Sequence, residues 1–269
     1  MSPLYAEVLQ FCLAQRAAQA RRPLIVGVQG PQGAGKSTLT RALIDALPAQ
    51  GLSGLTVSID DFYLTRSEQL AIAAANPGNR YLEHRGYPGT HDVALGERTL
   101  SEIAGRATVD GERLTVDGQR SVRVPRYDKS AHGGRGDRAP ESEWGHIDLP
   151  IDLVFVEGWM LGFTPVDEAS LSDQYLVPAN RALAEYHRWY QHIDVWVVLR
   201  ALDPNYVLTW RVEAEERMKA SGKPGLSRED IEDYIRRFLP AYQTWGGAPA
   251  NVPADKKIEI SVSLGREMV

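Results

Sequence analysis

The residues best suited to chemistry form one glycine-rich segment near the N-terminus. It reads GPQGAGKST and comprises Gly30, Pro31, Gln32, Gly33, Ala34, Gly35, Lys36, Ser37 and Thr38. Glycines let consecutive backbone N–H groups turn toward a phosphate, and a following helix adds the positive end of its dipole. In such a loop the lysine contacts the β- and γ-phosphates of a nucleotide, and the hydroxyl binds Mg²⁺. We therefore predict a site for a magnesium nucleotide here, with Lys36 assisting catalysis.

Acidic residues directly follow two apolar runs further along the chain. Asp60 and Asp61 follow Leu55–Ile59, and Glu157 follows Ile151–Val156. Asp60 is placed to act as a general base toward an acceptor hydroxyl, and it is also a candidate ligand of Mg²⁺. Glu157 is placed for a water-mediated contact to the metal, which makes Ser37, Asp60 and Glu157 the predicted metal set. The alternatives are that the two aspartates only cap the next segment and that Glu157 is merely solvated.

A basic stretch lies between these two acidic positions. The segment VRVPRYDKSAHGGRGDR contains the cations Arg123, Arg126, Lys129, Arg135 and Arg138, but only the acids Asp128 and Asp137. Local positive charge beside a phosphoryl-transfer site favours an anionic acceptor, because a guanidinium can grip a carboxylate with two hydrogen bonds. Tyr127, Asp128 and His132 in the same stretch are candidates for positioning acceptor hydroxyls, as are Asp61 and Tyr63. A solvated basic loop is the alternative.

A charged helical stretch that runs into a Gly- and Pro-containing break has the composition of a mobile lid. It spans Trp210–Ser227. Arg211 or Arg217 could swing from it onto the transferring phosphate, and we select Arg211 as the catalytic candidate. A surface ion pair between Glu213 and Arg217 is the alternative for the second arginine.

The elements that must position these residues alternate between strands and helices. Five apolar runs predict strands, at Pro23–Gln29, Leu55–Ile59, Ile151–Val156, Asp194–Leu199 and Lys257–Val262, of which the last alternates like an edge strand. Helices are predicted at Ser2–Ala20, Lys36–Leu47, Glu68–Ala75, Val93–Ala104, Asn180–His192 and Tyr206–Lys219. This order predicts an α/β fold of the P-loop NTPase type. We expect one domain over residues 1–269 with a doubly wound, mainly parallel sheet, a long insertion at about 76–140 and a helical lid at about 211–228.

Charge and composition narrow the class of protein. The chain has 269 residues, 43% of them hydrophobic, and a net charge of −5, which argues against nucleic acid or anionic lipid as a partner. The single cysteine, Cys12, fits a small buried side chain in a reducing compartment, so we expect a cytoplasmic protein. No guanine-specificity motif N-K-x-D is present, which favours an ATP-dependent small-molecule kinase over a GTPase switch.

Several longer motifs together resemble one known family. They are GPQGAGKSTL, SIDDFYLT, NPGN, GTHD, VPRYDKSAHGGRGDRA, VFVEGWMLGF, DPNYVLTWRVEAEERM and FLPAY. The sequence resembles the plant-type D-glycerate 3-kinases and their relatives, which are related to uridine kinase and phosphoribulokinase. The resemblance implies ATP- and Mg²⁺-dependent phosphorylation of the C3 hydroxyl of D-glycerate, a small hydroxy-carboxylate.

The same resemblance implies roles for particular residues. Asp60 matches the general base of the family, and Glu157 ends its Walker-B-like strand. The acceptor-binding segment matches Tyr127, Asp128, His132 and Arg135, although one extra residue separates the last two. The run Gly86–Gly89 (GYPG) is less polar than in the plant proteins, which bears on acceptor choice. The alternatives are a kinase of the same fold with another small acceptor (a sugar, a nucleoside or a pantothenate-like alcohol) and an ATP-binding module without catalysis.

Overall fold

A five-stranded parallel sheet forms the centre of the protein, which is described here from a computed structural model. Residues 3–21, 23–105, 120–220, 228–247, 249 and 251–267 are described. The strands are β1 (Leu24–Gln29), β2 (Gly54–Ser58), β7 (Leu153–Gly158), β8 (Val195–Ala201) and β9 (Lys257–Val262), in the spatial order β2-β7-β1-β8-β9. All four neighbouring pairs are parallel, so the carboxyl ends of the strands meet at one edge.

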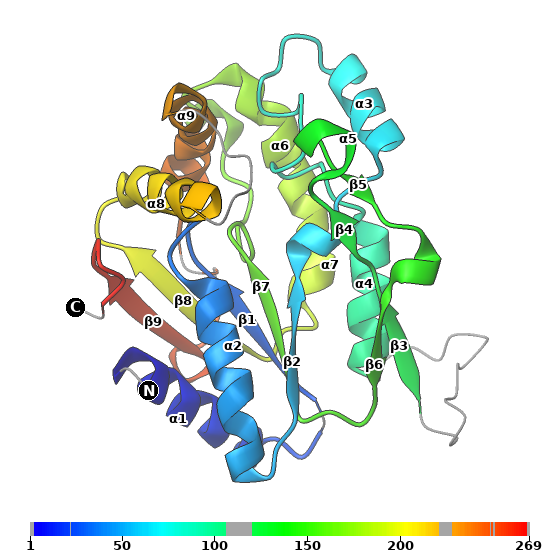
Figure 1. The fold of residues 1–269 in the computed structure, drawn as a ribbon, viewed down its shortest axis with the longest axis vertical. Helices are drawn as coiled ribbons and strands as arrows, with labels where there is room; N and C mark the ends of the chain where they lie inside the picture. The colour runs from blue at the N-terminus through cyan, green and yellow to red at the C-terminus, as the bar shows by residue number, and fades with distance from the viewer. Residues whose placement is uncertain are drawn as a thin grey trace.

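Two hydrophobic cores lie on the two faces of this sheet, because successive side chains of a strand point to opposite sides. Val26 and Val28 of β1 pack with α1 (Pro3–Ala18) and α2 (Lys36–Ala46), while Ile25 packs on the other face with α4 (Val93–Ile103). Figure 1 shows α2 lying across the front of the sheet with α1 beside it. The sheet is therefore covered on both faces, as predicted for a doubly wound fold.

A long insertion leaves the sheet at β2 and returns through β7. Its elements are η2 (Ile59–Phe62), α3 (Arg66–Ala75), α4, β3 (Ser121–Val124), β4 (Tyr127–Asp128), α5 (Ala131–Gly134), β5 (Asp137–Arg138), η3 (Glu141–Glu143) and β6 (Gly145–Asp148). Strands β3 and β6 form one antiparallel pair and β4 and β5 another. Figure 1 shows these elements gathered beside β2, on the opposite side of the sheet from β9.

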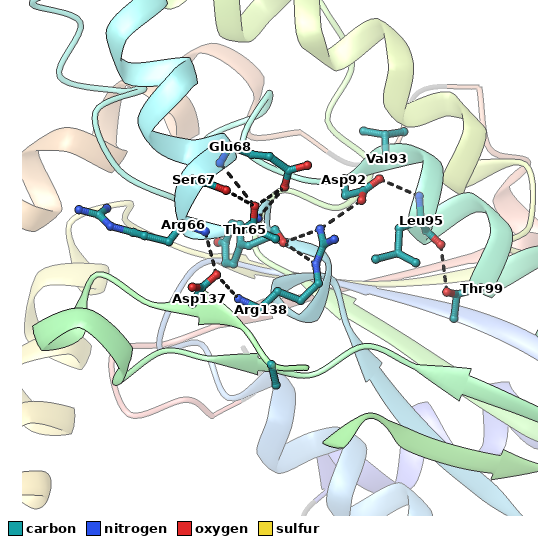
Figure 2. Close-up of polar contacts among 12 residues, drawn as sticks. Thr65, Arg66, Ser67, Glu68, Asp92, Val93, Leu95, Thr99, Asp137 and Arg138 are labelled. Atoms are coloured by element: carbon teal, nitrogen blue, oxygen red, sulfur yellow. Dashed lines mark hydrogen bonds and ion pairs between the residues drawn. The ribbon is translucent and has the colours of Figure 1, made fainter. Parts of the chain in front are cut away.

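Within the insertion, two residues of β5 hold the β4–β5 pair to the starts of α3 and α4 (Figure 2). The Asp137 carboxylate accepts a hydrogen bond from the Arg66 N–H at the start of α3, at 2.8 Å. Arg138 forms a 3.2 Å ion pair with Asp92, the N-cap of α4, and donates to the Tyr63 carbonyl oxygen at 2.9 Å. These contacts hold β4 and β5 against the segment that follows β2.

The rest of the chain supplies short helices and one helical hairpin. The remaining elements are η1 (Leu47–Gln50), η4 (Glu168–Ser170), η5 (Gln174–Leu176), α6 (Val177–Ala182), η6 (Leu183–Tyr186), α7 (His187–Tyr190), α8 (Tyr206–Ala220), α9 (Arg228–Trp245) and η7 (Ala254–Lys256). Helices α8 and α9 pack on each other, and α9 contributes to both cores. Within the described part of the chain, no helix is long and apolar enough to cross a membrane.

The predicted strands and helices agree with the structure except at two places, and the short strands β3 to β6 were not predicted. The run Leu55–Ile59 was expected to be an interior strand, but β2 lies at the edge of the sheet. The helix predicted over Asn180–His192 is divided into α6, η6 and α7. The sequence reasoning did not predict α9. Of the predicted lid, residues up to Ala220 belong to α8, and residues 221–227 lie outside the described residues.

Candidate active site

The phosphate loop joins β1 to α2, as the sequence predicts. Gly33 and Gly35 have φ angles of 83° and 95°, in the left-handed region that favours glycine. A Cβ atom on Gly33 would also stand 2.5 Å from the Cβ atom of Trp210, so this position has no room for a side chain. The loop is thus shaped by two glycines whose backbone conformation other residues rarely adopt.

Lys36 folds back over the loop. It is buried, and its Nζ atom donates to the carbonyl oxygens of Gly30 at 2.7 Å and Pro31 at 3.0 Å. Burial lowers the pKa of Lys36, although the nearby carboxylates of Glu157 and Asp60 act in the opposite direction. The ammonium group is therefore held at the loop, with two carboxylates within electrostatic range.

A hydroxyl and a carboxylate face each other beside Lys36. The Ser37 hydroxyl donates to Oε1 of Glu157 at 3.1 Å, which joins the start of α2 to the end of β7. Both are oxygen donors of the kind that Mg²⁺ uses with phosphate and water ligands. Among the described residues, no three His, Cys, Asp or Glu side chains gather to hold a metal by themselves. The donor set thus fits an ion that shares its shell with phosphates.

Asp60 stands at the end of β2, where η2 begins. Its N–H donates to the hydroxyl of Ser58, and its Oδ2 atom lies 2.5 Å from Nζ of Lys129. Burial raises the pKa of Asp60, but the cation of Lys129 and a hydrogen bond from Tyr63 outweigh burial and hold the pKa below its usual range. Asp60 is therefore ionised, in the form that can accept a proton.

Asp61 has a different environment from its neighbour. Its Oδ1 atom accepts a hydrogen bond from the N–H of Tyr127 at 3.2 Å, which attaches β4 to η2. Burial raises the pKa of Asp61 to about 6, and the nearby charge of Asp60 adds to this effect. In this structure the carboxylate of Asp61 anchors the insertion.

Aromatic rings line the side of the site next to Asp60. Tyr63 stacks on His91 with 4.3 Å between ring centroids, and its ring edge meets Tyr127 at 5.3 Å. His91 is buried, and its Nδ1 atom lies 2.8 Å from the hydroxyl of Tyr186. The sequence reasoning quoted the GTHD segment but gave His91 no role, because nothing local indicates that its ring packs on Tyr63.

Most cations of the basic stretch are engaged within the insertion. Arg123 lies 3.5 Å from Glu141 and 5.7 Å from the ring of Trp144. Arg138 binds Asp92, as described above, and the guanidinium of Arg135 contacts the ring nitrogen Nε2 of His84. The structure places only Lys129 against one of the predicted catalytic acids.

The other predicted acceptor contacts bind neighbours within the insertion. Asp128 accepts hydrogen bonds from the N–H and hydroxyl of Ser130, at 2.8 and 2.6 Å. His132, with a φ of 51°, lies 3.1 Å from Asp137. Arg126 is exposed. The structure does not bring Asp128 or His132 into direct contact with Asp60, so their roles in acceptor binding stay predictions.

The predicted catalytic arginine is paired along its own helix. Arg211 contacts Glu215, a buried residue one turn further along α8. Arg217 lies 4.0 Å from Glu213, which agrees with the surface pair considered from the sequence. Both arginines are thus paired with glutamates of α8, and the catalytic role of Arg211 stays a prediction.

The fold and the site together define a class of protein. The strand ends carry, in spatial order, Asp60 on β2, Glu157 on β7 and the phosphate loop on β1. A phosphate loop beside a hydroxyl–carboxylate pair and a further ionised aspartate has the parts that phosphoryl transfer requires. This arrangement on a parallel sheet is that of a P-loop kinase.

Comparisons with known proteins identify the family. No family model matches the chain. The structure of D-glycerate 3-kinase from Cryptococcus neoformans is similar over 100% of this chain and 98% of that chain, with a TM-score of 0.88 and 32% identity. The chain is also 38% identical over 255 residues to chloroplastic D-glycerate 3-kinase of Arabidopsis thaliana, covering 92% of this chain and 54% of that protein. It therefore spans about half the length of the Arabidopsis relative.

A third relative supports the same assignment. An uncharacterized kinase of Schizosaccharomyces pombe is 38% identical over 257 residues, covering 91% of this chain and 88% of the relative. Coverage of nearly the whole of two relatives shows that the match extends beyond the phosphate loop. The chain belongs to the D-glycerate 3-kinase family of P-loop kinases.

Proposed function

We propose that the protein transfers the γ-phosphoryl group of ATP to the C3 hydroxyl of D-glycerate, giving 3-phosphoglycerate. The observation that carries the proposal is the row of groups along the sheet edge, from Asp60 through Glu157 to Lys36. Membership of the family names the acceptor, because two of the relatives described above carry the name D-glycerate 3-kinase.

The phosphate loop and its neighbours form the donor half of the proposed mechanism. Lys36 neutralises charge on the β- and γ-phosphate oxygens, and the loop amides hold the same groups in place. Ser37 and Glu157 would hold Mg²⁺, with Asp60 as the third predicted ligand. When bound there, the ion would supply further neutralisation of the phosphate oxygens. Lys36 and the loop then fix the γ-phosphate for attack.

Asp60 is the general base of the proposed mechanism. An ionised carboxylate at the end of β2 can accept the proton of the acceptor hydroxyl as that oxygen bonds to phosphorus. The ion pair with Lys129 makes Asp60 a weak base, which suits phosphoryl transfer, because positioning and electrostatics supply most of the rate acceleration. Asp60 therefore orients the hydroxyl as well as accepting its proton.

Lys129 and the exposed Arg126 are the proposed contacts for the acceptor carboxylate. The Lys129 side chain is 57% exposed although its Nζ atom reaches Asp60, so a carboxylate can approach the ammonium from the solvent side. Arg126 lies three residues earlier at the start of the same β4 hairpin. A hydroxy-carboxylate bound in this way presents its hydroxyl to Asp60.

The direct test is a reaction followed by NMR. Purified protein, ATP, Mg²⁺ and D-glycerate should yield 3-phosphoglycerate. Formation of 2-phosphoglycerate would contradict the position of attack. Turnover of glycerol, a sugar, a nucleoside or pantothenate in place of D-glycerate would indicate a kinase of the same family with another acceptor and would remove the carboxylate contact.

The role of Asp60 has its own test. Asp60→Asn should lower kcat by ~10²–10⁴, the usual effect of losing a general base, while ATP binding stays nearly intact. Asp148→Asn, an exposed aspartate on β6 of the same insertion, is the control and should leave kcat unchanged. Unchanged turnover in Asp60→Asn would remove Asp60 from the mechanism.

A further inference from the structure

Arg266, in the turn after β9, binds the outer side of the phosphate loop. Nε of Arg266 donates to the carbonyl oxygen of Gly33 at 2.7 Å, and its Nη1 atom lies 2.9 Å from Oε2 of Glu213 on α8. The guanidinium also lies 5.4 Å from the ring centroid of Trp210. One side chain thus joins the phosphate loop, α8 and the turn after β9.

The turn that carries Arg266 is held in an unusual conformation. The N–H of Arg266 donates to the carbonyl oxygen of Ser263 at 2.9 Å. The N–H of Ser263 donates to the carbonyl oxygen of Glu267, also at 2.9 Å. Arg266 has a φ of 63°, in the left-handed region that costs energy for any residue with a side chain. Such a conformation persists only where surrounding contacts impose it, which indicates that the position of the side chain matters.

Trp210 fixes the same part of the loop from a second direction. Its Cβ atom lies against Gly33, and its Nε1–H donates to the carbonyl oxygen of Leu264 at 2.6 Å. Trp210 is fully buried. Arg266 and Trp210 therefore hold Gly33 between the turn after β9 and α8.

The orientation of one peptide unit depends on these contacts. A peptide unit is planar, so the carbonyl of Gly33 and the N–H of Ala34 point in opposite directions. With the carbonyl turned outward to Arg266, the N–H of Ala34 points into the loop, where it donates to the carbonyl oxygen of Pro31 at 3.2 Å. Glycine tolerates many backbone conformations, so loss of the Arg266 bond weakens the restraint that keeps this carbonyl oxygen turned away from the phosphates.

We propose that Arg266 is a positioning residue for MgATP. It holds the Gly33–Ala34 peptide with its carbonyl oxygen turned away from the phosphates, and Glu213 holds the guanidinium in turn. This inference rests on the proposed function only in taking ATP as the ligand. It is independent of the acceptor and of Asp60.

Calorimetric titration with MgATP, in the absence of any acceptor, tests the proposal. Arg266→Gly removes the side chain and places at φ 63° the residue that tolerates it best, so the turn is retained. We expect the dissociation constant of MgATP to rise about tenfold, the effect of one charge-assisted hydrogen bond. Arg266→Lys keeps the charge but cannot bond Gly33 and Glu213 at once in the same geometry, so it should bind MgATP almost as weakly as Arg266→Gly.

Glu213→Gln tests whether the two residues act together. Alone it should weaken binding about threefold, and in the Arg266→Gly background it should change nothing, because the group that it positions is gone. Arg200→Ala is the matched control, since Arg200 forms a 2.9 Å ion pair with Glu259 between β8 and β9 and has no described contact with the phosphate loop. Thermal unfolding of every variant shows whether the fold is retained.

Three results would overturn the proposal. The first is wild-type affinity in Arg266→Gly. The second is wild-type affinity in Arg266→Lys beside weak binding in Arg266→Gly, which would mean that the residue acts only as a charge that attracts the triphosphate. The third is a double variant whose dissociation constant for MgATP rises by the product of the two single-variant factors, because this would mean that Glu213 and Arg266 act independently. If the wild type binds MgATP without phosphorylating D-glycerate, the proposed function fails and this comparison still stands.

Discussion

Acidification should destabilise the protein through His91. This side chain is 5% exposed, stacks on Tyr63 and binds the hydroxyl of Tyr186 through Nδ1. Burial lowers the pKa of His91 from 6.5 to about 4, and the nearby charge of Asp60 opposes that shift only in part. The folded protein therefore keeps His91 neutral at a pH where the unfolded chain has already protonated it.

The sign and size of the effect follow from these two pKa values. Between pH 6.5 and about 4 the unfolded state binds a proton that the folded state does not, so stability is complete above pH 6.5 and is lost as the pH falls. One pKa unit corresponds to about 1.4 kcal/mol, so the full shift is worth about 3 kcal/mol. A loss of roughly 2–3 kcal/mol is expected at about pH 4.5 relative to neutral pH.

Denaturant unfolding at several pH values measures the effect. His91→Phe keeps an aromatic ring against Tyr63 but cannot bind a proton, so its stability should fall less between pH 7 and pH 4.5, whatever its absolute value. His146→Gln replaces an exposed histidine on β6 and should follow the wild type. Parallel curves for the wild type and His91→Phe would refute the reasoning, because other titrating groups are common to both proteins.

Two further predictions concern stability alone. Asp152→Ala should cost about 3–5 kcal/mol in denaturant unfolding, because it removes the partner of buried Arg16 and two hydrogen bonds from Ser53. Stability within about 1 kcal/mol of wild type would contradict that account. Gly96→Ala in α4 should lower the melting temperature although alanine favours helices, because its Cβ atom would lie 2.5 Å from the ring of Trp189. A raised melting temperature would mean that the ring yields at little cost.

The strands of the central sheet were predictable because each is a continuous apolar run in the sequence. Runs such as Leu24–Gln29 are apolar and buried on both faces, and the pattern alone locates them. The order of strands is not local, so the sequence could not show that β2 lies at an edge. Helix α9 was missed because Pro240 and many charges obscure it, although Ile231, Ile235 and Phe238 are spaced as on one helical face.

The site was predictable to the extent that its residues are contiguous or follow strands. The phosphate loop is one segment, and the carboxyl ends of parallel strands meet at one edge, so Ser37 and Glu157 were predicted at the same edge, while their direct contact depends on the pairing of β1 with β7. The ion pair of Asp60 with Lys129 joins residues 69 positions apart across an irregular insertion. Only the folded insertion shows that Arg123 is paired with Glu141 while Lys129 reaches the site.

The attachment of the insertion has a consequence for engineering new acceptor specificity. The whole segment from η2 to β6 is connected to the sheet through β2 and β7. These two strands are neighbours and pair from Gly54 with Leu153 to Ser58 with Glu157. A graft exchanged between these two strands would leave the path of the chain through β1, β8 and β9 unaltered. It would need to keep the packing of the insertion on the rest of the chain, such as Tyr87 on Phe238 of α9 and Phe62 on Trp189 of α7. Under the proposed function, acceptor choice would be altered by exchanging one continuous segment of the chain, provided that its share of the common core is kept.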